Sequence, residues 1–271
     1  MNQEPDEKYT LLNTAIQKAM VKRKAEKEAA FFIKELKPGI TLLDCGCGPG
    51  SITEGFAKIV NPAKVIGVDA DPVQIGDAQE RITKAGISNL TFKPASVYEL
   101  PFEDNSFDAV FSHARLEHLH DPLKALSEMK RVLKPGGLVG ARVPDHAAYL
   151  VSPDNELLKK GLKFERDLLA HKGGNPFIGR GLRGIFHEAG FINVVGSASY
   201  DHAGDKEHIE LVSTLLSGSF YKGGLVDQLI ELGWSNPDEL KQISDEWEKW
   251  KDNPAAFFGV ARCEAIGWKP A

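Results

Sequence analysis

Cysteine is scarce in this sequence, which excludes a fold stabilised by disulfides. Three cysteines among 271 residues give no disulfide framework, and this favours a reduced, cytoplasmic setting. Long apolar runs are also absent, so we expect no membrane span. The polar, charged N-terminus carries no recognisable signal peptide. No internal repeat or low-complexity tract divides the chain.

Basic residues are in deficit as well. Lys and Arg number 33 against 38 Asp and Glu, a formal net charge of −5. Enzymes that act on nucleic acids usually present a basic face, so we expect no nucleic-acid partner. The apolar content of 42% and the charged content of 26% are ordinary for a globular protein. The length suits one large domain, or a domain with a cap, around a real hydrophobic core.

Glycine, by contrast, is concentrated at one turn. Residues 42–50 read LLDCGCGPG, so that an apolar strand runs into Gly46, Gly48 and Gly50, and a helix is predicted to start at Ser51. Without a Cβ, these glycines allow a tight turn and the close approach of a ligand. The free amides of the turn and of the helix start can donate hydrogen bonds to a negative group.

A second predicted strand, residues 64–68, ends in Asp69. A carboxylate at this place can accept hydrogen bonds from two ribose hydroxyls. Together, the turn and this acid predict a nucleoside-type cofactor at the edge of a parallel sheet. The spacing is not that of the dinucleotide fingerprint, which needs a glycine where Ser51 stands. This counts against an alternative function as an NAD(P)-linked oxidoreductase.

Three further segments carry a family pattern: 95–102 (ASVYELPF), 103–111 (EDNSFDAVF) and 131–137 (RVLKPGG). With the glycine turn, and in this order, they resemble the class I S-adenosylmethionine-dependent methyltransferases. The likeness is greatest to the small-molecule branch that includes the ubiquinone/menaquinone-type enzymes (methyltransferase domain 11/25-like). It is close over residues 36–145 and looser over 174–195 and 256–268. It implies S-adenosylmethionine as cofactor, S-adenosylhomocysteine as product, and an α/β, Rossmann-like, mostly parallel seven-stranded sheet with helices on both faces.

The resemblance also implies cofactor-binding roles. It assigns them to Asp44, Gly46, Cys47, Gly48, Asp69, Ala70, Asp71, Ser96, Val97 and His113. At Ser96 the common pattern has an aspartate that accepts from the adenine amino group, whereas serine accepts without charge. This departure slightly favours a second alternative, a non-catalytic partner subunit of the same fold. The intact glycine turn and Asp69 count against that alternative.

Strands and helices alternate from residue 41 to 143, which is typical of a parallel sheet covered on both faces. We expect five regions: an N-terminal helical lid (1–36), the cofactor-binding α/β core (37–145), the remainder of the core with the sixth strand (146–204), a helical cap insertion (205–254), and the last strand and tail (255–271). The cap would lie over the C-terminal ends of the strands and shape a substrate pocket. The charge run 22–28 mixes both signs and is predicted to be a solvated helix face.

A polar cluster follows the fourth predicted strand. His113 is the candidate catalytic base, because histidine titrates near neutrality. Arg115 and His118 are candidate substrate contacts, and bracing of the loop is the alternative role of His118. Histidines and carboxylates are also metal-ligand types, but their spacing here matches no familiar zinc site, so we expect no metal.

Two more substrate candidates lie outside this cluster. Arg180 could bind an anionic substrate near the start of a helix, which Asn175 is predicted to cap. Tyr9 could contact the sulfonium of the cofactor through a cation–π interaction, with packing as its alternative role. The sequence thus predicts methyl transfer to a small-molecule acceptor by direct displacement. It leaves open the acceptor, the methylated atom (N, O, S or C) and the oligomeric state.

Overall fold

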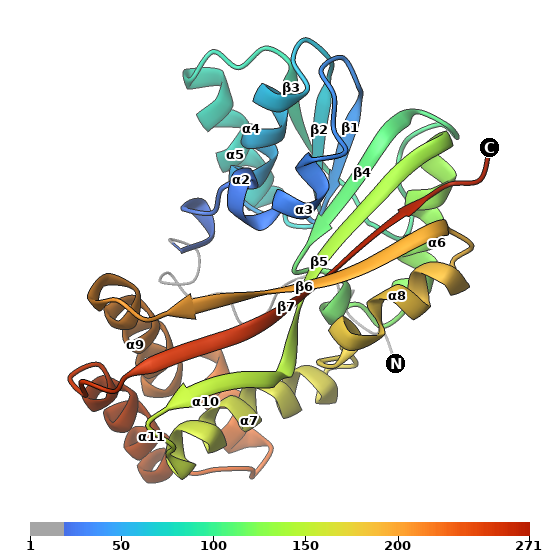
Figure 1. Ribbon diagram of the computed structural model, residues 1–271. Coiled ribbons are helices and arrows are strands. Elements are labelled where there is room, and N and C mark those ends of the chain that lie inside the picture. The colour runs from blue at the N-terminus through green and yellow to red at the C-terminus, as the bar shows by residue number, and fades with distance from the viewer. Residues whose placement is uncertain (1–18) are drawn as a thin grey trace.

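The computed structural model describes residues 19–271, which form one seven-stranded sheet with helices packed against it (Figure 1). The strands are β1 (Leu42–Cys45), β2 (Val65–Asp69), β3 (Leu90–Pro94), β4 (Phe107–His113), β5 (Leu133–Ser152), β6 (Ile192–Ala203) and β7 (Phe257–Trp268). Their order across the sheet is β3-β2-β1-β4-β5-β7-β6. Strands β1 to β5 run parallel, and β7 pairs antiparallel with both β5 and β6. The predicted mostly parallel, seven-stranded sheet is confirmed.

The chain order reverses at β1, because β1 pairs with β2 on one side and with β4 on the other. In an open parallel sheet, such a switch point leaves a crevice at the carboxyl ends of the strands, where ligands bind. Helix α5 (Pro72–Lys84) starts directly after β2, where the Asp71 side chain accepts from the Val73 amide at 2.9 Å. Helix α6 (Pro122–Val132) is capped in the same way by Asp121. The two caps fix short loops at the edge of the sheet where the crevice lies.

Both faces of the sheet are covered by helices, as predicted. One face packs against α2 (Ala25–Glu28), α3 (Ala30–Ile33), α4 (Ser51–Ile59) and α5. The other packs against α6 and α8 (Ile178–Glu188). Neighbouring residues of one strand serve opposite faces: Leu42 belongs to the first core and Leu43 to the second. The central strands therefore read as continuous apolar runs.

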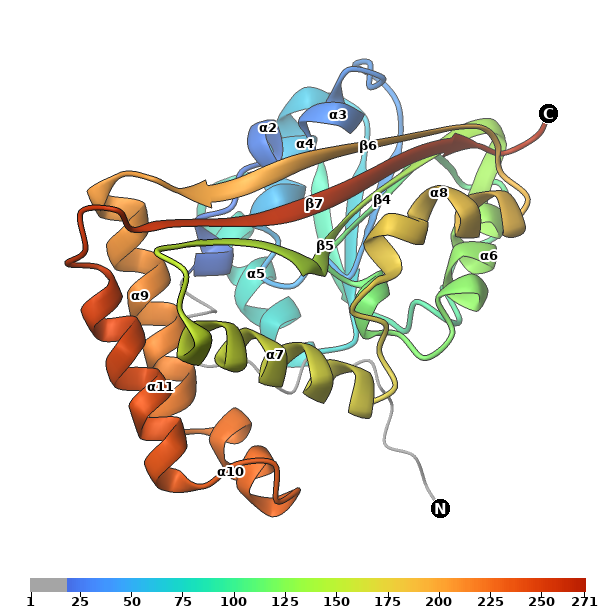
Figure 2. The ribbon, with the colours of Figure 1, turned by 60° about the horizontal axis from the view of Figure 1, so that its bottom comes forward.

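Four further helices build a cap with a hydrophobic core of its own (Figure 2). They are α7 (Glu156–His171), α9 (Lys206–Tyr221), α10 (Gly224–Glu231) and α11 (Pro237–Trp250). Trp247 and Leu229 are fully buried in this core, which also includes Phe258 from the start of β7. Helices α9 to α11 lie between β6 and β7 in the chain, whereas α7 precedes β6 and packs in the same cluster. No helix in the described part of the chain is long and apolar enough to cross a membrane.

Strand β5 bends where it passes from the sheet to the cap (Figure 1). Its pairing with β7 runs to Pro144 and resumes at Tyr149. Asp145 and His146 lie in this break, where the His146 amide donates to the carbonyl of Pro176 at 3.0 Å. Breaks of this kind re-aim side chains and recur beside active sites.

Two local predictions were wrong. The charge run 22–28 is not a solvated helix face throughout, because Glu28 is only 6% exposed and pairs with the buried Arg142 at 2.6 Å. Helix α8 has Phe177 at its N-cap position, without a side-chain cap. Asn175 instead accepts from the Phe177 amide at 3.0 Å and so stabilises the turn before the helix.

Candidate active site

The glycine turn follows β1 at the switch point of the sheet. The amides of Gly46 and Cys47 donate to the carbonyl of Val68 at 2.8 and 3.0 Å, which ties the turn to the end of β2. Gly46 and Gly48 have φ of +76° and +51°, a region that glycine adopts at little cost. A Cβ on Gly46 would lie 2.8 Å from Cγ of Arg115. Gly46 is therefore needed both for its conformation and for the room that Arg115 occupies.

Asp69 joins the two loops at this edge of the sheet. Its Oδ2 accepts from the Gly48 amide at 2.9 Å, and its Oδ1 accepts from the Asp71 amide at 3.0 Å. These bonds fix the carboxylate, which is 8% exposed, in the wall of a cavity. Each carboxylate oxygen keeps a further lone pair, which suits a ligand with two neighbouring hydroxyls.

Asp44 is the second carboxyl group at this place. The Thr53 hydroxyl of α4 donates to its Oδ2 at 2.7 Å, and the residue is 2% exposed. Burial raises the pKa of Asp44 to about 7, against the opposing effect of the Thr53 hydrogen bond. A positive charge beside it would favour the ionised form. This end of the cavity thus fits a ligand that carries a cationic group and a pair of hydroxyls.

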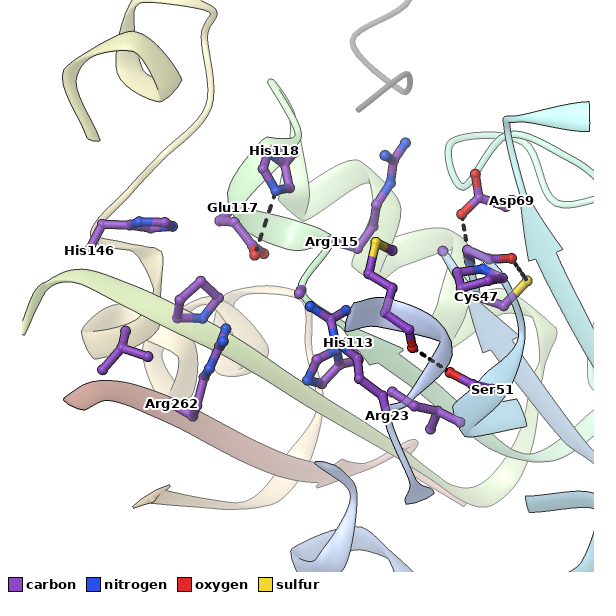
Figure 3. A pocket seen from close by; sticks show the side chains of 18 of the residues that line it. Arg23, Cys47, Ser51, Asp69, His113, Arg115, Glu117, His118, His146 and Arg262 are labelled. Atoms are coloured by element: carbon purple, nitrogen blue, oxygen red, sulfur yellow. Dashed lines mark hydrogen bonds and ion pairs between the residues drawn. The ribbon is translucent and has the colours of Figure 1, made fainter. Parts of the chain in front are cut away.

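One cavity of ≈290 Å³ runs from the glycine turn to the cap (Figure 3). Asp69 and the glycine turn line one end, and the segment from His113 to His118 lies in the middle. We call the other end the distal chamber, which is lined by Pro144, His146, Tyr149, Leu162, Glu165, Leu216, Phe258, Val260 and Arg262. The geometry therefore joins a cofactor-type site to a second compartment.

Most residues singled out by the sequence meet in this cavity. Its lining includes Asp44, Gly46, Cys47, Gly48, Asp69, Asp71, His113, Arg115 and His118. Ala70, Ser96 and Val97 are not among its lining residues in the described structure. The Ser96 hydroxyl accepts from the Tyr98 amide at 3.0 Å, and Val97 packs in the sheet core. Tyr9 lies outside the described residues.

Arg180 is placed away from the cavity lining. It forms a bidentate pair with Asp145, with its Nε 2.7 Å from Oδ2 and its Nη2 2.8 Å from Oδ1. Burial acts to raise the pKa of Asp145, but the Arg180 guanidinium outweighs it and the pKa lies below its ordinary value. The pair ties α8 to the break in β5, and this contact favours a structural role for Arg180.

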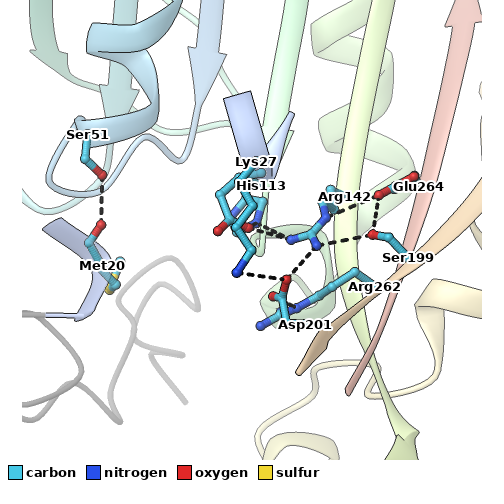
Figure 4. A network of polar contacts seen from close by, with 10 residues as sticks. Met20, Lys27, Ser51, His113, Arg142, Ser199, Asp201, Arg262 and Glu264 are labelled. Carbon is cyan, nitrogen blue, oxygen red and sulfur yellow. Dashed lines mark hydrogen bonds and ion pairs between the residues drawn. The ribbon is translucent and has the colours of Figure 1, made fainter. Parts of the chain in front are cut away.

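His113 lies in a buried polar network (Figure 4). Its Nε2 is 3.3 Å from Oε2 of Glu28 and 3.3 Å from Nη1 of Arg142. Burial lowers the pKa of His113 to about 4, although the Glu28 hydrogen bond opposes this. The imidazole is therefore neutral at pH 7 and a weak base. Its buried Nδ1 has no hydrogen-bond partner among the described residues, which suits a hydrogen bond to a ligand better than proton abstraction.

Arg142, on β5, is the centre of that network. Its guanidinium contacts three carboxylates: Glu28 at 2.6 Å, Asp201 at 2.9 Å and Glu264 at 3.3 Å. These come from α2, β6 and β7, so the network fastens the N-terminal stretch to the long strands. That stretch also carries Arg23, which lines the cavity. The network therefore helps to define the cavity wall.

Sequence reasoning missed most of the distal chamber. Glu117, in the 3₁₀ turn η1 (Leu116–His118), lines the cavity, as do His146, Glu165 and Arg262. The position of Glu117 in the turn between β4 and α6 is a signal that could have marked it. His146, Glu165 and Arg262 come from the β5 break, α7 and β7, and no local pattern marks them. Within residues 19–271, no group of three or more His, Cys, Asp or Glu could hold a metal ion.

Comparison with known proteins agrees with this geometry. Residues 43–140 match the family model described as a methyltransferase domain. An uncharacterized methyltransferase of Schizosaccharomyces pombe is 34% identical over 251 residues, which cover 87% of each chain. A demethylmenaquinone methyltransferase of Staphylococcus aureus is 33% identical over 219 residues, covering 74% of this chain and 89% of the relative.

Solved structures share the fold. The YcgJ protein of Bacillus subtilis superposes with a TM-score of 0.59 at 20% identity, over 90% of this chain and 98% of that protein. The phosphoethanolamine N-methyltransferase 2 of Haemonchus contortus was solved with phosphomonomethylethanolamine and S-adenosylhomocysteine. It superposes with a TM-score of 0.55 at 21% identity, over 98% of this chain and 55% of that protein.

The parallel sheet, the glycine turn, the acid at the end of β2 and the two-part cavity define a group-transfer enzyme with a nucleoside cofactor. The relatives matched over most of the chain make the class specific: the protein belongs to the class I S-adenosylmethionine-dependent methyltransferases. S-adenosylmethionine is its cofactor, and S-adenosylhomocysteine is the product formed from it. The cationic group and ribose hydroxyls of this cofactor fit the surroundings of Asp44 and Asp69.

Proposed function

We propose that this enzyme methylates a small-molecule acceptor by direct displacement. The observation that carries the proposal is that the glycine turn and the distal chamber line the same continuous cavity. The bound cofactor supplies a methyl group activated by a positive sulfur. The protein then contributes mainly by holding the acceptor in line with that methyl group and by excluding water.

At the cofactor end, we assign each residue a binding role. The Gly46 to Gly48 turn and Asp44 would hold the methionine part, and Asp69 would bind the ribose hydroxyls. Support comes from the fixed carboxylate of Asp69 and from the turn of Gly46 to Gly48, which lines the cavity. His113 would form a hydrogen bond with the cofactor through Nδ1, which has no hydrogen-bond partner among the described residues.

At the acceptor end, the lining of the distal chamber and the net charge of the chain support a small-molecule acceptor. Leu162 and Leu216 come from the cap, and Phe258 and Val260 come from β7, so much of the wall is apolar. The net charge of −5 disfavours a polynucleotide acceptor. The Staphylococcus relative is named for demethylmenaquinone, itself a small molecule.

The test is incubation of the enzyme with methyl-labelled S-adenosylmethionine and a cell extract separated into small-molecule, protein and nucleic-acid fractions. We expect the label to enter a compound of the small-molecule fraction, with release of S-adenosylhomocysteine. Label confined to protein, tRNA or DNA would contradict the proposed acceptor class. Salt-sensitive binding to tRNA would contradict it as well.

A further inference from the structure

Glu117 presents a buried carboxylate oxygen to which no residue of the described chain donates a hydrogen bond. The side chain is 1% exposed and belongs to the η1 turn at the end of β4, in the middle of the cavity wall. Its Oε1 lies 3.8 Å from Nε2 of His118. Its Oε2 has no hydrogen-bond partner within the described chain. Leaving such an oxygen unsatisfied is costly, which is explained if a ligand supplies the donor.

A second buried polar atom lies unpartnered in the same cavity. His146 sits in the β5 break, and its Nδ1 is 2.8 Å from the hydroxyl of Tyr149. Its Nε2 has no hydrogen-bond partner among the described residues. Figure 3 shows Glu117 and His146 on the side of the cavity away from Asp69. Together, Glu117 and His146 offer a ligand two polar positions, one in the middle of the cavity and one in the distal chamber.

The groups around Glu117 are mostly cationic or neutral. Those that act on its charge, or that line the middle of the cavity and the distal chamber, are Arg23 before α2, His113 on β4, Arg115 and His118 beside it, His146 on β5, Glu165 on α7 and Arg262 on β7. The carboxylates of Asp44, Asp69 and Asp71 line the cofactor end of the same cavity. Burial raises the pKa of Glu117 to about 7, while Arg262, Arg115 and Arg23 oppose the rise. Burial lowers the pKa of His113 and of His146 to about 4. Near neutrality, Glu117 can therefore both take up and release a proton.

We propose that Glu117 is the catalytic base for an acceptor with a largely apolar body and a hydroxyl group, which is methylated on oxygen. The inference rests on the proposed function. The hydroxyl proton moves to Oε2 of Glu117, and the acceptor oxygen bonds to the methyl carbon. The carbon–sulfur bond breaks, and its electron pair stays on sulfur. A second polar group of the acceptor binds Nε2 of His146.

The charges favour a neutral hydroxyl over a carboxylate or an ammonium group. A carboxylate acceptor brings a negative charge against Glu117 and has no proton to give. An ammonium acceptor brings a positive charge toward the sulfonium and toward Arg115 and Arg262. A neutral hydroxyl meets neither penalty, and the arginines stabilise the negative charge that develops on its oxygen. A thiol ionises more readily and has less need of a buried base.

The first test is the chemical class of the labelled product from the small-molecule fraction. An O-methyl ether keeps its label in mild alkali and releases it as methyl iodide in hydriodic acid, and this is the expected result. A methyl ester, or an N-, S- or C-methyl product, overturns the proposal. Absence of any labelled product while calorimetry shows that S-adenosylmethionine binds also overturns it. Failure to bind S-adenosylmethionine refutes the proposed function itself.

The second test compares variants on that product. Glu117→Gln should lower kcat by about 10²- to 10⁴-fold, the usual share of a general base, and should remove the rise of rate with pH near 7. Glu117→Asp should keep the rise at a reduced rate. Glu188→Gln, an exposed glutamate on α8, is the matched control and should behave as the unmodified enzyme. If Glu117→Gln keeps the pH-dependent rise, or if Glu165→Gln alone removes it, the proposal is wrong.

A third measurement does not depend on turnover. In a protein with ¹³C-labelled glutamate carboxyl groups, the resonance missing from Glu117→Gln should titrate near pH 7 in the absence of cofactor. Titration of that resonance near 4.5, like an ordinary glutamate, would contradict the role of base. Calorimetry should show unchanged affinity of Glu117→Gln for S-adenosylmethionine, which separates the loss of rate from a loss of folding.

Discussion

The Asp69 carboxylate fixes two backbone amides and faces the cavity, where we propose that it also binds the ribose of the cofactor. We expect Asp69→Ala to weaken S-adenosylmethionine binding by at least about 1.5 kcal/mol, roughly tenfold or more, through loss of charge-assisted hydrogen bonds. Isothermal calorimetry measures this directly. Asp77→Ala, an exposed position on α5, is the control. Unchanged affinity in a folded Asp69→Ala protein would remove the assignment.

Arg142 is a residue whose importance is structural. It is 2% exposed, and Glu28 and Glu264 around it are also buried, so its removal leaves carboxylates without their cation. We expect Arg142→Met to lower the free energy of unfolding by about 3–5 kcal/mol. Urea unfolding checks this, with the exposed Arg183→Met as control. A loss under about 1 kcal/mol would show that the network contributes little.

Single residues were predictable where their role is local. The glycine turn and Asp69 follow from strand, turn and spacing, all within about thirty residues of chain. Glu28 was misread as solvated because its partner Arg142 is 114 positions away. His146 was missed for a similar reason, since its position depends on a break in the pairing of β5 with β7.

At the scale of elements, we propose that the cap helices influence acceptor choice through α9, because its Leu216 lines the distal chamber. We expect Leu216→Trp to fill part of that chamber, and so to raise KM for the acceptor or lower turnover several-fold, while leaving the affinity for S-adenosylmethionine unchanged. Radiometric turnover and calorimetry give the two values. Leu211→Trp, exposed on the same helix, is the control. Loss of cofactor affinity with unchanged acceptor kinetics would contradict this role of the cap.

Replacing residues 205–252 with a short linker is a harsher test of the same idea. The third hydrophobic core includes Leu158 and Leu168 of α7 as well as Phe258 of β7. Deleting α9 to α11 would expose these side chains, so the point substitution is the cleaner experiment.

The helices and strands themselves were largely predictable, because periodicity and turn residues report them. Helices α9 to α11 lie within residues 205–254, where helices are predicted, and β6 lies within residues 146–204, where the sixth strand is predicted. The packing of α7 with the later cap helices was not predictable. It depends on the long strands β5, β6 and β7, which bring α7 and the helices α9 to α11 into one cluster.

For the whole molecule, the sequence carried the fold class and the cofactor, since both rest on motifs in the parallel part of the sheet. The distal chamber draws on segments from residue 144 to residue 262 and has no motif. The set of side chains that line the distal chamber is therefore known only from the folded structure. The same arrangement places the glycine turn and the distal chamber, our proposed cofactor and acceptor sites, on the two sides of the segment that follows β4.

A crystal structure with S-adenosylhomocysteine bound tests most directly whether one cavity serves both cofactor and acceptor. The ribose hydroxyls should contact Asp69, and the sulfur should face the His113 to Glu117 segment, with the distal chamber beyond it. A ligand bound outside this cavity would contradict the account. So would a sulfur that points away from the distal chamber.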